Sequence, residues 1–248
     1  MALGLERSLA VGGRRSLLLI ALASGFLFIN QFAFVYALKL GTATTVALIL
    51  GTTPIFAAIF SSLTGLERLS LRFWFAAAIG FAGVALVALG SGGDLSSDLG
   101  GDLLATLVAI TWAAYSVVIA PLMRRYSPYR ISAVVLLVMC VPFVAASSPQ
   151  LAEQDYGSLS ALVWICLAFA IVGPLFLTNL LWFTAIHHVG PSRATLFANF
   201  QPFLAAVFAY LILSEHLHPL QVAGGFTILV GIVLERRWRR APLPVPVE

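Results

Sequence analysis

The sequence has little charge and almost no cysteine. Only 10% of its 248 residues are charged, and Cys140 and Cys166 are its two cysteines. Soluble domains carry about a quarter charged residues, which sets the chain apart from that class. Two cysteines within apolar stretches do not form a disulfide framework, and we expect both to be buried. No nucleotide-binding glycine loop, G-x-S-x-G or H-E-x-x-H is found either, so we expect no enzyme.

The sequence is instead rich in long apolar runs. Sixty percent of its residues are hydrophobic, and the mean hydropathy is +1.00. Runs of about 20 residues cross a hydrocarbon core roughly 30 Å thick when they are helical. We therefore predict an all-α polytopic membrane protein with eight transmembrane helices. The predicted spans are 16–38, 43–64, 71–90, 102–123, 130–148, 159–187, 192–213 and 219–235.

The basic residues support this number of spans. If the N-terminus is cytoplasmic, all of the 14 Lys and Arg except Lys39 fall in cytoplasmic segments. Positively charged loops resist translocation, so this asymmetry predicts a multi-pass protein of the cytoplasmic membrane with both termini inside the cell. Because these arginines are spread over five segments, we expect no nucleic-acid partner.

Two stretches of the chain resemble each other. ALILGTTPIFAAIFSSLTGLE (47–67) aligns with LFANFQPFLAAVFAYLILSE (196–215). The alignment pairs Pro54 with Pro202, Glu67 with Glu215, Gly83 with Gly231 and, across a one-residue shift, Asn30 with Asn179. We interpret 16–90 and 159–235 as related blocks. Because five spans precede the second block, the two blocks cross the membrane in opposite directions, as the inverted repeats of secondary transporters do.

One motif in these blocks resembles a known family. P-x-x-A-A-x-x-x-x-x-x-x-x-E, followed by a helix with spaced glycines, is similar to the pattern of the EamA-type drug/metabolite transporters. It occurs as PIFAAIFSSLTGLE (54–67) and as PFLAAVFAYLILSE (202–215). The resemblance implies two inverted repeats of five helices. It also implies transport of small metabolites, such as amino acids, or of amphipathic compounds, often outward.

The number of helices departs from that family pattern, because three helices are followed by five. We expect an incomplete first repeat in 1–90, a second repeat in 102–235 and a basic, Pro-rich cytoplasmic tail in 236–248. The opening MALGLERSLAVGGRRS resembles a loop between spans, so we expect two more helices upstream. If the chain starts at Met1, one wall of the family's cavity is absent. A non-transporting protein, either a partner subunit or a truncated inactive member, is then the alternative.

Polar and aromatic residues at mid-membrane depth indicate a binding cavity, because unpaired polar groups in hydrocarbon are costly. Amides bind the polar end of a solute, and aromatic rings shield its apolar body. The candidates for the cavity are Asn30, Gln31, Thr53, Trp112, Tyr115, Asn179, Trp182, Asn199 and Gln201. Structural bonding between helices is the alternative for each amide. We expect the aligned Asn30 and Asn179 at one central interface.

Three prolines within spans predict helix breaks. Pro54, Pro174 and Pro202 each remove the donor for a carbonyl one turn earlier. Such carbonyls are tolerated in a membrane where they are buried or face a water-filled cavity. The alternative is a static kink.

Charged residues are missing from the middle of every predicted span. Glu67 and Glu215 lie at helix ends, where we expect an interfacial or capping role, so no carboxylate is placed to relay protons. His187–His188 and His216–His218 lie at opposite faces, and we expect no metal and no cofactor. The sequence thus predicts a secondary transporter that exports a neutral, zwitterionic or amphipathic solute by alternating access. Its expected partners are that solute and the lipid bilayer, and a homodimer is left open.

Overall fold

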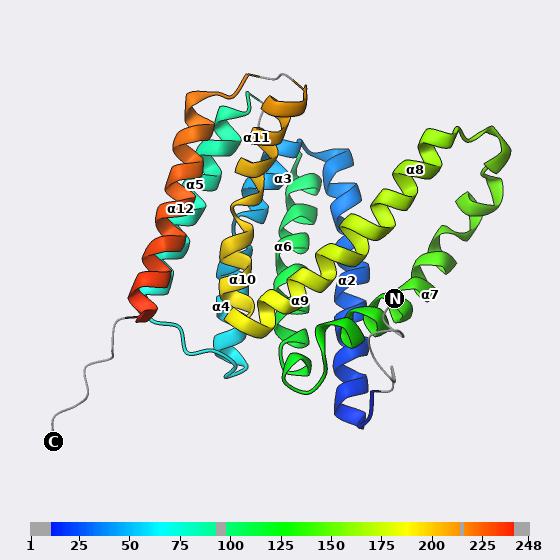
Figure 1. Ribbon diagram of the computed structural model, residues 1–248, viewed down its shortest axis with the longest axis horizontal. Coiled ribbons are helices and arrows are strands. Elements are labelled where there is room, and N and C mark those ends of the chain that lie inside the picture. Colours follow the sequence, from blue (N-terminus) through cyan, green and yellow to red (C-terminus); the bar gives the residue numbers. More distant parts are fainter. Residues whose placement is uncertain (1–10, 93–97, 214–215, 241–248) are drawn as a thin grey trace.

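The computed structural model describes residues 11–92, 98–213 and 216–240 (Figure 1). These residues form helices joined by short connections, and no strand occurs among them. Eight of the described helical segments are long and apolar enough to cross a membrane. This confirms the predicted all-α polytopic fold.

The helices follow the predicted spans closely. The first four spans contain α2 (Arg14–Leu40), α3 (Ala43–Leu50) with α4 (Thr53–Leu63), α5 (Leu71–Gly90), and α6 (Leu99–Ile119) with η1 (Leu122–Arg124). The last four contain α7 (Pro128–Glu153), α8 (Ala161–Ala170) with η3 (Ile171–Leu177) and α9 (Thr178–Val189), α10 (Pro191–Ala198) with α11 (Gln201–Leu213), and α12 (Pro219–Arg240). The short η2 (Tyr156–Ser158) joins α7 to α8. The clearest differences are at two ends, because α7 continues to Glu153, past the predicted end at 148, and α12 continues to Arg240, past the predicted end at 235.

The bundle has two unlike ends. The starts of α2, α5 and α10 and the end of α12 lie together at the bottom of Figure 1. Arg14, Arg72, Arg193 and Arg236 lie in or near the terminal turns of these helices, so we call this the arginine-rich end. The opposite end carries Lys39 near the end of α2, together with the starts of α3, α6 and α12.

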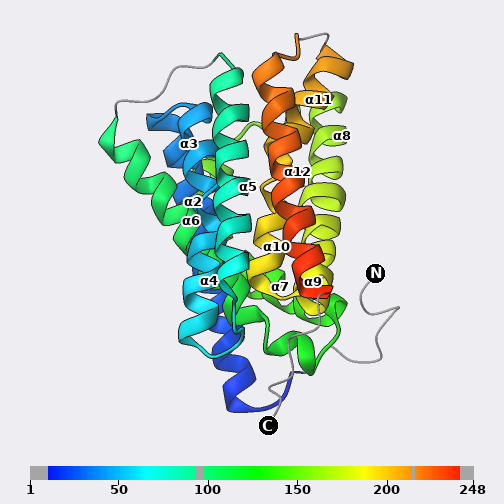
Figure 2. The ribbon, with the colours of Figure 1, turned by 90° about the vertical axis from the view of Figure 1, so that its left-hand side faces the viewer.

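The helices α5 and α12 lie side by side along their length (Figures 1 and 2). Glycines let their backbones approach closely, as is common between transmembrane helices. A Cβ added at Gly83 would lie 2.7 Å from the carbonyl oxygen of Gly224, and one at Gly231 would lie 2.8 Å from that of Ala76. Gly231 is the counterpart of Gly83 in the alignment that pairs Pro54 with Pro202. In the same alignment Gly224 is the counterpart of Ala76. Each contact is thus the counterpart of the other, as expected around a pseudo-two-fold axis.

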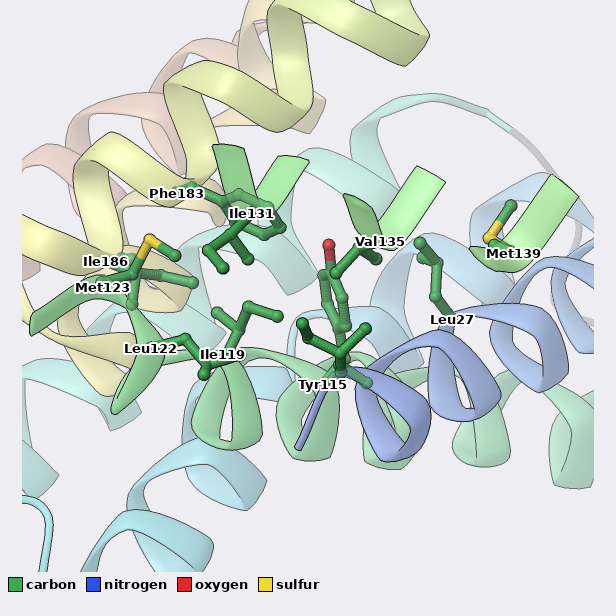
Figure 3. Close-up of a cluster of buried hydrophobic side chains, with 13 residues drawn as sticks. Leu27, Tyr115, Ile119, Leu122, Met123, Ile131, Val135, Met139, Phe183 and Ile186 are labelled. Carbon is green, nitrogen blue, oxygen red and sulfur yellow. The ribbon is translucent and has the colours of Figure 1, made fainter. Parts of the chain in front are cut away.

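The largest apolar cluster lies among α2, α6, η1, α7, α9 and α10 (Figure 3). It packs Leu27 of α2 against Tyr115 and Ile119 of α6 and against Phe183 of α9. In a bilayer, close packing of these side chains, rather than their removal from water, holds the helices together where they meet.

The hairpin of α7 and α8 extends away from the other helices (Figure 1). No residue of α8 is buried, and apolar side chains such as Val141 and Phe169 are exposed. In a membrane protein this surface suits contact with lipid chains. The expectation that the cysteines are buried is wrong, because Cys140 of α7 and Cys166 of α8 are both exposed on this hairpin.

Candidate functional site

A cavity of about 470 Å³ lies between α2, α5, α6, α9 and the broken helix pairs α3–α4 and α10–α11. Seven of the nine residues expected to line a cavity border it, together with one of the three prolines. These eight are Asn30, Gln31, Thr53, Trp112, Trp182, Asn199, Gln201 and Pro202. The lining residues that the sequence reasoning missed are Phe34, Ala47, Leu50, Gly51, Val84, Val108, Thr195, Ala198 and Ala205.

Equivalent residues of the two blocks face this cavity. The first block contributes Ala47, Leu50, Gly51 and Thr53. In the alignment that pairs Pro54 with Pro202, their counterparts in the second block are Thr195, Ala198, Asn199 and Gln201, which also line the cavity. The Nδ2 of Asn199 donates to the carbonyl of Gly51 at 3.1 Å, so a position of one block contacts its own counterpart. The cavity therefore surrounds the place where the two blocks meet. In these four pairs the member from the second block is polar three times, and the member from the first block once.

The two breaks in the helices border the cavity. Between α3 and α4 the helix is interrupted at Gly51 and Thr52, and between α10 and α11 at Asn199 and Phe200. The hydroxyl of Thr53 donates to the carbonyl of Leu50 at 2.6 Å, which replaces the donor that Pro54 removes. Pro54 itself is buried, whereas Pro202 faces the cavity.

Aromatic rings and amides make up the distinctive part of the wall. The rings of Trp112 and Trp182 lie 5.4 Å apart between centroids and come from α6 and α9. Asn30 donates from Nδ2 to the carbonyl of Val108 at 2.9 Å and to Oγ1 of Thr111 at 3.1 Å. Among the described residues, no side chain that lines the cavity is charged.

Tyr115 and Asn179 lie outside the lining. Tyr115 is fully buried in the apolar cluster, and its hydroxyl donates to Oδ1 of Asn179 at 3.3 Å. Asn179 donates in turn to the carbonyl of Leu175 at 2.7 Å, within its own helical segment. Asn30 and Asn179 form no hydrogen bond with each other, and each bonds instead to side chains or backbone of α6. Pro174 lies within the π-helix η3, on the same segment as Asn179.

A charged contact that we call the latch lies at the arginine-rich end, and it consists of Glu67, Ser192, Arg193 and Glu235. Oε2 of Glu67 accepts from the backbone N–H of Ser192 at 3.1 Å and from its hydroxyl. Arg193 lies 3.7 Å from Oε1 of Glu67 and donates from Nε to Oε1 of Glu235 at 2.5 Å. The latch therefore joins α10 and the end of α12 to the segment after α4.

Glu67 does have the capping role that the sequence suggested, but on a distant helix. The N-cap residue of α10 is Gly190, which has no side chain to accept from the first N–H groups. Glu67, which belongs to the other block, accepts from the N–H of Ser192 and so caps α10. On α3 the N-cap residue Thr42 caps its own helix by accepting from the N–H of Thr45. Glu215 lies outside the described residues.

The described residues contain no group of three or more His, Cys, Asp or Glu that could hold a metal ion. His187 contacts the carbonyl of Met123 at 2.8 Å through Nδ1, and its ring lies 5.2 Å from that of His188. The cavity can thus offer amides, hydroxyls, carbonyls and indole rings to a solute, which is a set of groups for binding.

The chain matches one protein-family model over most of its length. The model is that of the EamA-like transporter family, and it matches residues 3–89 and 99–235. The chain belongs to the EamA-like transporter family. This agrees with the resemblance of its two proline–alanine–glutamate motifs, and it makes the chain a multi-pass membrane protein of a transporter family.

Curated relatives of this EamA-like protein are described as transporters. An uncharacterized transporter of Archaeoglobus fulgidus is 24% identical over 222 residues, which cover 85% of this chain and 72% of that protein. The uncharacterized transporter YyaM of Bacillus subtilis is 22% identical, and the match covers 81% of this chain and 66% of YyaM. The uncharacterized inner membrane transporter YedA of Escherichia coli is 27% identical, and the match covers 76% of this chain and 60% of YedA. The chain thus spans about two thirds of the length of these relatives.

A solved crystal structure has the same fold. It superposes on 90% of this EamA-like chain and on 78% of its own chain, with a TM-score of 0.74 and 18% sequence identity. At this identity the similarity shows the arrangement of the helices alone.

Proposed function

We propose that this EamA-like protein is a secondary transporter that exports a small organic solute, such as an amino acid or an amphipathic compound. Transport proceeds by alternating access between the inverted repeats. The observation that carries the proposal is the cavity at the two helix breaks, lined by equivalent residues of both blocks. Transporters with inverted repeats bind their substrates near the bilayer midplane at such interrupted helices.

The size and chemistry of the cavity support a small solute without strong net negative charge. Its volume of about 470 Å³ lies within the range of small-molecule sites. The amides of Asn30 and Asn199 supply polar contacts, and the rings of Trp112 and Trp182 supply an apolar wall.

The arrangement also fits one state of an alternating-access cycle. On α2 and α6 the lining residues Asn30 and Trp112 are followed, toward the arginine-rich end, by the buried Leu27 and Tyr115. The latch lies beyond them at that end. Gln201 and Phe34 are exposed on the other side of the lining. A state that opens to the arginine-rich end would have to separate both the apolar cluster and the latch.

The distribution of arginines supports an orientation with the arginine-rich end in the cytoplasm, together with both termini. A green fluorescent protein fused to the C-terminus fluoresces only when it folds in the cytoplasm, whereas alkaline phosphatase is active only outside. We expect fluorescence and no phosphatase activity. The reverse pattern would overturn the orientation.

The non-transporting alternative predicts a closed central interface with Asn30 bonded to Asn179. Asn30 instead bonds to Val108 and Thr111 of α6, and the cavity is present. No contact in the described part of the chain favours that alternative.

Flux through proteoliposomes tests the transport proposal. Vesicles with the purified protein are loaded with a panel of amino acids and small amphipathic amines, and counterflow of each labelled solute is measured. We expect saturable counterflow that Trp112→Ala and Trp182→Ala each lower at least about tenfold, since each substitution removes a large part of the apolar wall. Trp164→Ala is the matched control, because Trp164 is exposed on α8. No saturable flux of any solute would refute the proposal.

A further inference from the structure

We propose that the cavity selects solutes with a protonated amine on an apolar or aromatic body and rejects carboxylates of the same shape. This inference rests on the proposed transport function and names its substrate class. It follows from the direction in which the rigid polar groups of the wall point.

The first rigid group is the amide of Asn30. Both hydrogens of its Nδ2 are used, one by the carbonyl of Val108 and one by Oγ1 of Thr111. The Thr111 hydroxyl donates to the carbonyl of Leu107 at 2.7 Å, so its oxygen is the acceptor toward Asn30. A flipped amide would place Oδ1 against the Val108 carbonyl, which is unfavourable because both are acceptors. Asn30, which is buried and lines the cavity, therefore presents its oxygen.

The second rigid group is the amide of Asn199. Its Nδ2 donates to the carbonyl of Gly51 at 3.1 Å and lies 3.9 Å from the place where a Cβ on Gly80 would be. The amide nitrogen of Asn199 thus faces α5 and the break between α3 and α4. The same argument against a flipped amide holds, because Oδ1 would then face the Gly51 carbonyl. No described residue donates to Oδ1 of Asn199, which is left for a solute.

The hydroxyls and the proline break add further acceptors. Thr53 donates to the carbonyl of Leu50, and Thr195 donates to the carbonyls of Pro191 and Ser192 within its own helix. Pro202 has no N–H, so the carbonyl of Ala198 in the lining lacks the donor of a regular helix. These groups therefore offer oxygen lone pairs, and not hydrogens, to a solute.

Donors in the wall are few. Among the described lining residues, the indole N–H groups of Trp112 and Trp182 are rigid donors without a partner, and that of Trp182 is buried. Gln31 and Gln201 make no hydrogen bond with the described residues, so their amides can turn either way and set no preference. A carboxylate would lose its water without gaining a cation, and it would face the fixed oxygens of Asn30 and Asn199, which is unfavourable.

An ammonium group finds what it needs in the same space. It has three N–H donors for the oxygens of Asn30, Asn199 and Ala198, and cations are attracted to the faces of indole rings such as those of Trp112 and Trp182. The apolar part of the solute can then lie along the remaining wall. The chemistry therefore favours amines over carboxylates, and also over zwitterionic amino acids, whose carboxylate remains unsatisfied.

Binding of four matched probes tests this selectivity. The probes are 2-phenylethylamine, 2-phenylethanol, 3-phenylpropionate and phenylalanine, which share an aromatic body and differ in charge. The full chain is placed in lipid nanodiscs with Trp74, Trp164 and Trp238 replaced by Phe, so that the emission reports on Trp112 and Trp182. We expect the amine to bind at least about tenfold more tightly than the alcohol, and the two carboxylates to give no saturable change.

A pair of variants tests the role of the amide oxygen. Asn199→Ala removes one acceptor, and we expect amine affinity to fall about tenfold while alcohol affinity falls less than about threefold. Asn179→Ala is the matched control outside the lining, and we expect both affinities within about twofold of the parent. If Asn199→Ala does not fold, the four probes on the parent chain decide alone.

Two results would overturn the amine proposal. The first is that 3-phenylpropionate or phenylalanine binds as tightly as the amine. The second is that the amine does not bind at all. Neither result bears on transport itself, because counterflow with other solutes judges that separately.

Discussion

The latch at the arginine-rich end gives the most decisive test of the proposed cycle. Glu67 joins the segment after α4 to the start of α10, and its side chain is 10% exposed. The substitution Glu67→Ala removes the acceptor for the N–H and hydroxyl of Ser192 without adding bulk. If this contact holds the arginine-rich end closed, its loss favours the state that is open there.

The magnitude follows from the contacts that disappear. A hydrogen bond to a charged group contributes about 1.5–3 kcal/mol, and the 3.7 Å pair with Arg193, whose side chain is 23% exposed, adds less than about 1 kcal/mol. Because Arg193 keeps Glu235 at 2.5 Å, it is not left without a partner. The ratio of the open to the closed state should therefore rise about ten- to a hundredfold.

Accessibility of a cysteine in the cavity measures this ratio without any substrate. The reporter is Ala198→Cys in a chain that also carries Cys140→Ser and Cys166→Ser, labelled with a membrane-impermeant maleimide. In inverted vesicles, where the arginine-rich end faces the reagent in the proposed orientation, Glu67→Ala should raise the labelling rate at least about tenfold. In right-side-out vesicles the rate should fall.

The matched control is Glu153→Ala, at the exposed end of α7. It should leave both labelling rates within about twofold of the parent. The reasoning about the latch fails if Glu67→Ala labels at the parental rate in inverted vesicles. It also fails if Glu153→Ala has the same effect, since the change would then report general loosening.

Three further substitutions test the packing that supports the site. Gly190→Ala places a Cβ 2.1 Å from Oε1 of Glu67 at a φ of +84°, so the apparent melting temperature in detergent should drop by several degrees. Gly83→Ala, whose Cβ meets backbone atoms of α12 at 2.7 Å, should destabilise by about 1–3 kcal/mol, whereas Gly25→Ala, with nothing within 4 Å, should be neutral or stabilising in the same measurement. Asn30→Ala removes two hydrogen bonds to α6, and unfolding in denaturant should show a loss of about 1–3 kcal/mol. A parental midpoint for any of the three destabilising changes would contradict the contact concerned.

Much of the fold could be predicted because a membrane constrains the sequence strongly. A span has to be about 20 apolar residues long, so the eight segments stand out without any knowledge of packing. The polar residues near Pro54 and Pro202 were also informative, since Thr53, Asn199 and Gln201 have few reasons to lie in hydrocarbon. The break between α8 and α9 differs from the others, because Pro174 lies in a π-helix.

The partners of individual polar groups could not be predicted, because an amide in an apolar helix looks the same whether it meets a cavity or a neighbour. Asn179 is such a case, since its oxygen accepts from Tyr115 of α6. The contact of Glu67 with Ser192 joins residues 125 apart in the chain, which no local pattern indicates.

The apolar part of the lining was missed for a different reason. Ala47, Leu50 and Val108 carry no polar signal and resemble the lipid-facing residues around them. The repeat did contain the information for Gly51, because it is the counterpart of the predicted Asn199. It could not indicate Ala47 and Leu50, because their counterparts Thr195 and Ala198 carry no stronger signal and were missed as well.

The hydrogen bond from Asn199 to Gly51 has an energetic consequence for the two states of the proposed cycle. Two identical halves related by an in-plane axis would give an inward-open and an outward-open form of equal free energy. A donor at one position and only a carbonyl at its counterpart remove that degeneracy, because exchanging the roles of the halves cannot reproduce this bond. In the proposed cycle, the divergence of this one aligned pair would favour one of the two states even before any gradient acts on the protein.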